Sequence, residues 1–132
     1  MLLTKKSEYA LLALVLISNS SKPKNAETIA NELNISKSFL SKILQVFTKK
    51  EILKSFKGVN GGFVLVIPPC QLTILDITTL AEEKIPSVFE CSISMSCCPD
   101  GTASCCSIWP LLNNLQKKID GFLRELTLKD IM

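Results

Sequence analysis

The chain has 132 residues, 47% of them hydrophobic, so it fits one ordinary domain or a small domain with a dimerisation element. It contains no histidine, no convincing pair of catalytic carboxylates and no phosphate-binding glycine loop, which argues against an enzyme. Residues 1–66 contain ten lysines and four glutamates, a balance of +6, whereas residues 67–132 contain five basic and eight acidic residues, a balance of −3. The positive half is a candidate for binding an anionic partner such as nucleic acid, and residues 1–69 and 70–132 are predicted to be two functional parts.

Residues 5–19, KKSEYALLALVLISN, predict a first helix that is apolar around most of its surface. A basic start before an apolar run is also typical of a secretory signal, in which case the six cysteines would form a disulfide framework. Glu8 interrupts the approach to this run, no small-x-small cleavage site follows it, and it is too short to span a membrane. We therefore expect a buried helix of a cytoplasmic protein, where clustered cysteines more often indicate metal or redox chemistry.

A helix-turn-helix pattern follows the polar break NSSKPKN. Asn25 is a good N-cap for the helix AETIANEL, and Asn34 suits a tight turn because asparagine tolerates a left-handed backbone. The next helix is predicted over residues 36–51, with Ser36 as its N-cap. Its inward-facing stripe consists of Phe39, Leu40, Ile43, Leu44 and Phe47. A short helix, a turn and a second helix indicate DNA binding, with the second helix as the recognition helix.

Two strand-like runs, ILKSF and GFVLV, flank the segment KGVNGG, in which Asn60, Gly61 and Gly62 are strong hairpin-turn residues. A basic-tipped hairpin directly after a helix-turn-helix is a wing. The sequence therefore predicts a mainly α fold with a small β-hairpin wing, in which a winged helix-turn-helix domain precedes a long C-terminal dimerisation helix.

The residues expected to contact DNA lie at the start of the recognition helix and on the wing: Ser36, Lys37, Ser38, Ser41, Lys42, Lys54, Lys57 and Asn60. Lys5, Lys22 and Lys24 are assigned instead to a plain solvated face. The only arginine, Arg124, lies outside this region, so lysine, serine, asparagine and DNA shape must provide the readout, and binding should depend strongly on salt.

After the wing, TILDITTLAEE predicts a short amphipathic helix, and WPLLNNLQKKIDGFLREL predicts a long one with Pro110 in its first turn. Apolar residues of the long helix recur at steps of 3, 4, 3 and 4 and form a heptad seam: Leu112, Leu115, Ile119, Phe122 and Leu126. The seam could pack within its own chain, but in a short chain with a C-terminal helix it favours a symmetric homodimer.

Five cysteines lie between residues 91 and 106, in CSISMSCCPDGTASCC. Adjacent cysteines seldom bind one metal together, so Cys91, one of Cys97 and Cys98, and one of Cys105 and Cys106 would supply three ligands. No CxxC pair occurs, whereas iron–sulfur clusters are held mainly by cysteine thiolates on spacings that vary by class. Cys70 stands apart from this group and is expected to be a small buried residue.

The chain resembles the IscR/NsrR/RirA-type winged helix-turn-helix iron–sulfur transcriptional regulators. The matching residues are LT at 3–4, YAL at 9–11, IA at 29–30, ISKSFLSKIL at 35–44, KSFKGVNGGFVL at 54–65 and PPCQLTILDI at 68–77, with the cysteine segment and the long helix after them. The resemblance covers essentially the whole chain.

This resemblance implies a homodimeric bacterial transcription factor that binds a palindromic operator and whose DNA affinity follows the state of a [2Fe–2S] or [4Fe–4S] cluster. The expected ligands are Cys91, Cys97 and Cys105, with Cys98 and Cys106 as alternates. Some members of the family use a carboxylate of the partner subunit's first helix as the fourth ligand, and Glu8 occupies that position here. Such a cluster would sense redox state, nitric oxide or iron.

Two other functions are compatible with parts of the sequence. The cysteines could form disulfides on oxidation, which would give a cluster-free, thiol-switched DNA-binding regulator. A small electron-transfer or cluster-carrier protein, docking through its basic half, is disfavoured by the helix-turn-helix and the wing.

Overall fold

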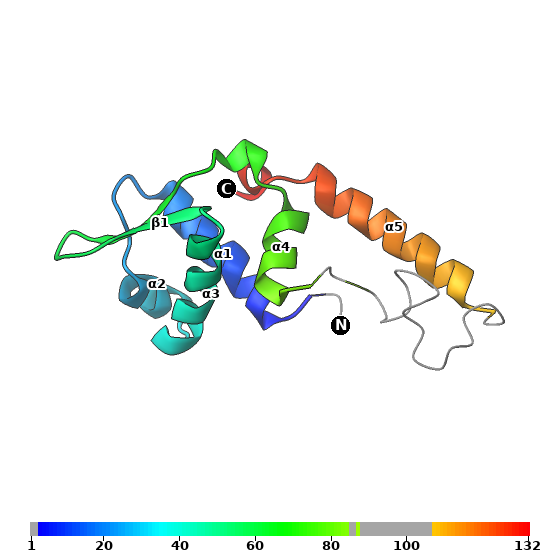
Figure 1. Ribbon diagram of the computed structural model, residues 1–132, viewed down its shortest axis with the longest axis horizontal. Helices are drawn as coiled ribbons and strands as arrows, with labels where there is room; N and C mark the ends of the chain where they lie inside the picture. The colour runs from blue at the N-terminus through cyan, green and yellow to red at the C-terminus, as the bar shows by residue number, and fades with distance from the viewer. Residues whose placement is uncertain (1–2, 85–86, 88–106) are drawn as a thin grey trace.

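The computed structural model describes residues 3–84, 87 and 107–132. Its elements, in chain order, are α1 (Lys5–Asn19), α2 (Ala26–Leu33), α3 (Lys37–Lys49), β1 (Leu53–Phe56), β2 (Gly62–Leu65), the 3-10 helix η1 (Pro69–Gln71), α4 (Ile74–Glu82), α5 (Trp109–Glu125) and α6 (Leu128–Ile131). The β1–β2 hairpin and the N-terminal end of α5 project from opposite ends of the molecule (Figure 1). This is the predicted mainly helical fold with a hairpin wing. Among the described residues, no helix is long and apolar enough to cross a membrane.

Side-chain caps define the helix-turn-helix. The Asn25 side chain accepts a hydrogen bond from the Thr28 backbone N–H at 2.7 Å, and the Ser36 hydroxyl accepts one from Phe39 N–H at 3.2 Å. Asn34 ends α2 in the left-handed conformation, with φ of 56°. These three features were predicted. The recognition helix α3 ends earlier than residue 51 because Glu51 adopts a left-handed φ of 61°.

The wing is a two-stranded antiparallel hairpin in which Phe56 pairs with Gly62. Its turn is closed by a hydrogen bond from Gly61 N–H to the Gly58 carbonyl at 3.0 Å, and Gly58 takes the positive φ of 109°. The turn therefore lies one residue earlier in the chain than the predicted Asn60–Gly61–Gly62 positions, and Gly62 begins β2. A Cβ atom on Gly62 would lie 2.4 Å from the Lys24 carbonyl carbon, so only glycine fits there.

The base of the wing is attached to the loop before α2. Phe63 N–H donates to the Lys24 carbonyl at 2.8 Å, and Lys24 N–H donates to the Phe63 carbonyl at 3.4 Å. This antiparallel bridge holds the α1–α2 loop beside β2 and explains the close approach at Gly62.

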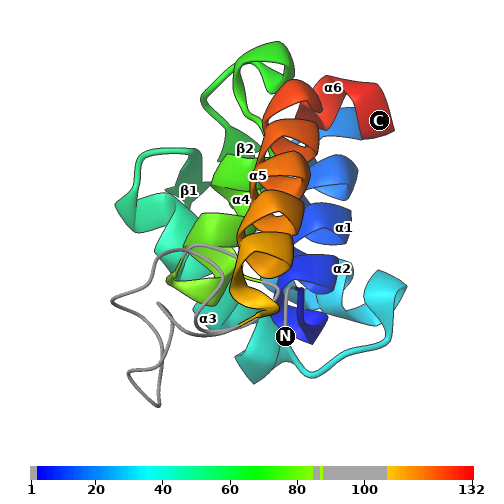
Figure 2. The same ribbon diagram turned by 90° about the vertical axis from the view of Figure 1, so that its right-hand side faces the viewer.

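One hydrophobic cluster joins the elements. Its most completely buried large members come from α1, α2, α3, β1, α4 and α6: Leu14, Ile29, Leu40, Leu44, Phe47, Leu53, Ile77 and Leu128. The cluster therefore contains residues from both predicted parts of the chain. Figure 2 shows α5 running in front of α4, against which it packs.

The sequence analysis did not predict α6. Thr127 and Asp130 form a capping box at its start, and Thr127 pairs with Thr73 in an isolated antiparallel bridge. Leu128 N–H donates to the Leu72 carbonyl at 2.8 Å, which places the Leu128 side chain in the core. The T-x-x-D spacing is a readable local signal, but a helix of four residues is too short to show an apolar period.

The prediction for Cys70 was wrong. Cys70 lies in η1, between the wing and α4, and is exposed and unpaired. A single 3-10 turn whose residues are all outside the core leaves a small thiol on the surface.

Candidate functional site

The N-terminal part of α3 presents the predicted DNA-contacting side chains. Lys37, Ser38 and Lys42 are exposed, and Ser41 is half-buried. Ser36 is also exposed, but its hydroxyl caps α3 and lies 3.5 Å from the Ser38 hydroxyl. The recognition helix thus presents two ammonium groups and serine hydroxyls at its start, where a helix-turn-helix contacts DNA.

The wing presents the other predicted group. Lys54, Lys57 and Asn60 are exposed, and Val59, at the tip, is fully exposed. The Lys54 ammonium lies 5.3 Å from the centre of the Phe56 ring, a cation–π contact that orients this lysine on the outer face of β1. The wing is therefore basic along β1 and apolar at its tip.

A hollow of about 310 Å³ separates the recognition helix from the wing. It is bordered by Lys37 of α3, by Ser55 and Gly62 of the hairpin, and by Asn25 at the start of α2. Lys37 of the predicted recognition-helix group and the hairpin that carries the predicted wing residues therefore border a single hollow.

Lys22 also lies beside the wing, which the sequence analysis missed. Lys22 and Asn60 border another hollow, of about 460 Å³, between the α1–α2 loop and the wing tip. Lys24, in the same loop, forms an ion pair with Glu32 at 2.7 Å, whereas Lys22 is exposed. No local sequence signal places Lys22 here, because its position depends on the long-range bridge between Lys24 and Phe63.

Glu8, the predicted carboxylate ligand, is exposed in the first turn of α1. Its carboxylate accepts a hydrogen bond from the Lys5 ammonium at 3.0 Å, and this bond, with the charge of Glu8, raises the pKa of Lys5. A hollow of about 380 Å³ lies against Glu8 and is bordered also by Leu3 and Leu11. Glu8 is therefore open to a second molecule, with an exposed lysine as its present partner.

The start of α1 is tied to the end of α4 through Glu82. Its Oε1 accepts hydrogen bonds from Thr4 N–H at 3.1 Å, from the Ser7 hydroxyl at 2.8 Å and from the Thr4 hydroxyl. Partial burial by itself raises the pKa of Glu82, but these hydrogen bonds outweigh it and the pKa is lowered. Glu82 thereby fixes the α1 turn that carries Glu8 against the end of α4, two residues before the described segment ends at Lys84.

The predicted cysteine ligands, Cys91, Cys97 and Cys105 with alternates Cys98 and Cys106, lie outside the described residues. Within the described ranges, no group of three or more Cys, His, Asp or Glu side chains could hold a metal ion. The ligand set therefore stays a prediction.

The heptad seam of α5 divides into two sets. Leu112 is buried, and Ile119 and Leu126 pack against the core of the same chain. Leu115 and Phe122 are 41% and 61% exposed. They continue a row of exposed apolar side chains, the α5 stripe, which consists of Ile108, Leu111, Leu115 and Phe122. Part of the seam thus faces its own chain, and part is left on the surface.

A helix-turn-helix followed by a basic hairpin, with a core-packed fourth helix, defines a winged helix-turn-helix DNA-binding protein. The chain belongs to the Rrf2 family, described as iron-dependent transcriptional regulators, which it matches over residues 3–132.

Named relatives agree with this assignment. An HTH-type transcriptional regulator of Aquifex aeolicus is 28% identical over 133 residues, covering 100% of this chain and 92% of the relative. The HTH-type transcriptional regulator IscR of Cronobacter sakazakii is 24% identical over 134 residues, covering 100% and 80%. The structure of CymR, the global cysteine regulator of B. subtilis, matches with a TM-score of 0.77 at 22% identity, covering 99% and 95%, and shows the same fold.

Proposed function

We propose that this transcriptional regulator acts as a homodimer, binds a palindromic operator through α3 and the wing, and senses redox state, nitric oxide or iron through an iron–sulfur cluster. The observation that carries the proposal is that a basic recognition surface and an exposed apolar helix occur in one chain of a family described as iron-dependent. Its site of action would be the cytoplasm, where bacterial chromosomal DNA lies.

The DNA-binding part of the proposal rests on the exposed side chains of α3 and the wing. Lys37 and Lys42 would contact phosphates beside the major groove, with Ser38 and Ser41 near base edges. Lys54, Lys57 and Asn60 would reach the adjacent groove from the wing. Because α3 and the wing contain no arginine, the salt-dependent contribution of lysine to affinity should be large relative to direct base recognition.

The dimer part rests on the α5 stripe. An apolar row of this length on a surface helix favours contact with another apolar surface, and a two-fold axis lets the same stripe cover itself. A two-fold dimer presents two recognition helices to successive turns of DNA, which is the reason to expect a palindromic operator.

The cluster part rests on the donor set. Cys91, Cys97 and Cys105 would hold the cluster as thiolates, with Cys98 and Cys106 as alternates, and Glu8 of the partner subunit would supply an oxygen. Thiolates with one carboxylate fit an iron–sulfur cluster, and Glu8 is accessible for this role. When bound, the cluster would supply a centre whose charge and integrity respond to oxidants, nitric oxide or iron supply. Lys5 would donate a hydrogen bond to the free Glu8 carboxylate, and Glu82 would hold the α1 turn that carries Glu8 in place.

The test is anaerobic purification followed by an absorbance spectrum with iron and sulfide counts per chain. We expect a coloured protein with near-stoichiometric iron and sulfide, and weakened visible bands in Glu8→Ala. Glu27→Ala, an exposed glutamate in the first turn of α2, is the matched control. A protein that stays colourless after anaerobic reconstitution would contradict the cluster.

A cluster-free thiol switch is the second candidate, and the exposed, unpaired Cys70 favours it. In this case an oxidant would change the DNA affinity of iron-free protein by forming disulfides, and a reductant would reverse the change. Mass spectrometry of the oxidised protein would identify the paired cysteines. DNA binding of iron-free protein that is insensitive to oxidant would exclude this candidate.

A further inference from the structure

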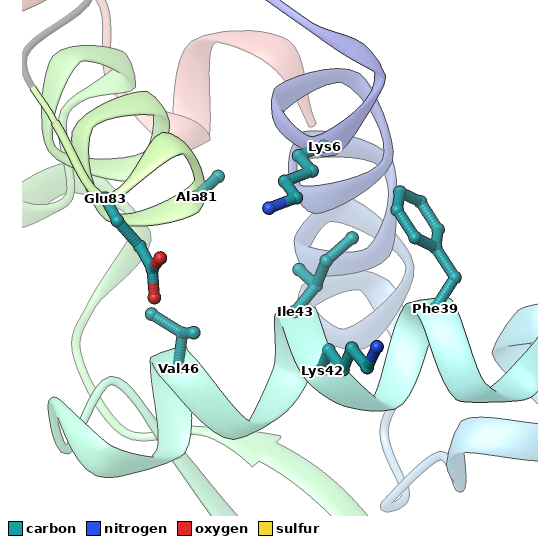
Figure 3. A pocket seen from close by; sticks show the side chains of 7 residues that line it. All are labelled: Lys6, Phe39, Lys42, Ile43, Val46, Ala81 and Glu83. Carbon is teal, nitrogen blue, oxygen red and sulfur yellow. The ribbon is translucent and has the colours of Figure 1, made fainter.

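A cavity of about 280 Å³ lies where α1, α3 and α4 meet (Figure 3). Its floor is apolar: Ile43 of α3 and Ala81 of α4 are core residues, 5% and 6% exposed, and Val46 is half-buried beside them. The floor therefore belongs to the core, and the cavity volume holds roughly nine water molecules, or one molecule with about that many heavy atoms.

Two opposite charges face each other across this floor. In Figure 3 the Lys6 ammonium points into the cavity from α1, and the Glu83 carboxylate points into it from the end of α4. Glu83 has a left-handed backbone, with φ of 59°. The ion pairs of the described residues are Lys5–Glu8 and Lys24–Glu32, so Lys6 and Glu83 are not bonded to each other. Lys42 borders the same cavity from α3 as a second cation.

We propose that this cavity binds a free aliphatic α-amino acid. The ligand carboxylate would pair with Lys6, its ammonium group with Glu83, and its side chain would lie on Ile43, Val46 and Ala81. A zwitterion pairs with Lys6 and Glu83 at once, whereas an anion leaves Glu83 without a partner and a cation leaves Lys6 without one. An apolar floor with a few converging charged groups is the usual composition of a small-molecule site.

A second hollow, of about 460 Å³, lies beside the cavity, since Val46 and Glu83 border both. A ligand in the cavity would touch α1, α4 and the inner side of the recognition helix together. The site shares Lys42 with the DNA-contacting surface and shares no residue with the predicted cluster ligands.

The first test is isothermal titration calorimetry of the purified full chain with three probes of similar shape. Leucine carries both charges, 3-methylbutylamine lacks the carboxylate, and 4-methylpentanoate lacks the ammonium group. We expect leucine to bind and each analogue to bind at least about tenfold more weakly, the factor for one lost charge pairing. No heat of binding with leucine at about 10 mM, well above a Kd of roughly 1 mM, would overturn the proposal, as would equal affinity for either analogue.

Variants then test the two charged residues. Lys6→Ala and Glu83→Gln should each weaken leucine binding about tenfold. The matched controls are Lys129→Ala, an exposed lysine of α6, and Glu51→Gln, an exposed glutamate that also has a left-handed backbone, with φ of 61°. The exchanged pair Lys6→Glu with Glu83→Lys should recover part of the affinity that each single exchange removes. Circular dichroism checks that each variant is folded, and unchanged leucine affinity in both folded single variants would contradict the assignment.

Discussion

Apolar side chains are buried to different extents in the winged body, residues 5–82, and in α5. In the body, residues far apart in sequence bury one another: Phe47 of α3 is 0% exposed in the shared cluster. In α5, one side packs on that cluster through Leu123, while Phe122, its neighbour in the chain, is 61% exposed. The apolar side chains of the body are therefore buried by contacts within the chain, α5 and α6 included, whereas the α5 stripe becomes buried only against another surface.

The largest expected effect is in the body. Phe47→Ala should lower the free energy of unfolding by about 3–5 kcal/mol, because it removes a fully buried ring and leaves a cavity between helices. Urea unfolding followed by circular dichroism measures this loss. At low protein concentration, Phe122→Ala should change stability by only about 0.5 kcal/mol. Equal losses in the free energy of unfolding for Phe47→Ala and Phe122→Ala would contradict this difference between the body and α5.

The next effect concerns association. Phe122→Glu should weaken self-association by about 2 kcal/mol or more, because it puts a charge in place of the only aromatic side chain of the α5 stripe. Analytical ultracentrifugation over a range of concentrations measures the dimer constant. Lys117→Glu, an exposed change on the opposite side of α5, is the control and should leave that constant nearly unaltered. A wild-type chain that is monomeric at all concentrations would contradict the dimer.

The joint between the start of α1 and the end of α4 should be sensitive to pH. Since the pKa of Glu82 is lowered from its ordinary value of 4.5, this carboxylate stabilises the fold above pH 4.5, and its contribution is lost as the pH falls through the lower, folded-state pKa. Glu82→Gln should cost about 1–2 kcal/mol at neutral pH and make stability less dependent on pH in the acid range. Urea midpoints from pH 7 down to pH 3 measure this, with Glu27→Gln as the exposed control. If the urea midpoint of Glu82→Gln falls with pH as steeply as that of the wild type, another group is responsible for the acid sensitivity.

The smallest single effects should be on DNA affinity. Lys37→Ala and Lys57→Ala should each weaken DNA binding by about the same factor whatever the sequence of the duplex. Each should also lower the slope of log affinity against log salt by about 1, because each removes a phosphate contact. Fluorescence anisotropy at several salt concentrations measures both quantities. Lys22→Ala should behave in the same way if the loop beside the wing also faces DNA. Lys129→Ala, on α6, should leave the slope unchanged.

Much of the winged body could be predicted because its signals are local. Asn25 and Ser36 cap helices with their own side chains, and Asn34 takes the left-handed conformation that asparagine tolerates. The candidate DNA-contacting residues were identified for the same reason, since their positions follow from the order of helix, turn, helix and hairpin. The wing turn lies one residue earlier than predicted, because the bridge between Lys24 and Phe63 requires a glycine at residue 62 within β2.

The sequence by itself determined where helices begin, which faces are apolar and which side chains could bind DNA or iron, because these properties depend on neighbours a few residues away. Only the tertiary structure decided how those faces are used. It divided the α5 seam between the core and the surface, put Cys70 in an exposed turn, brought Lys22 to the wing, and set Lys6 opposite Glu83 across an apolar floor. Each outcome depends on contacts between segments distant in the chain, for which periodicity and spacing carry no information.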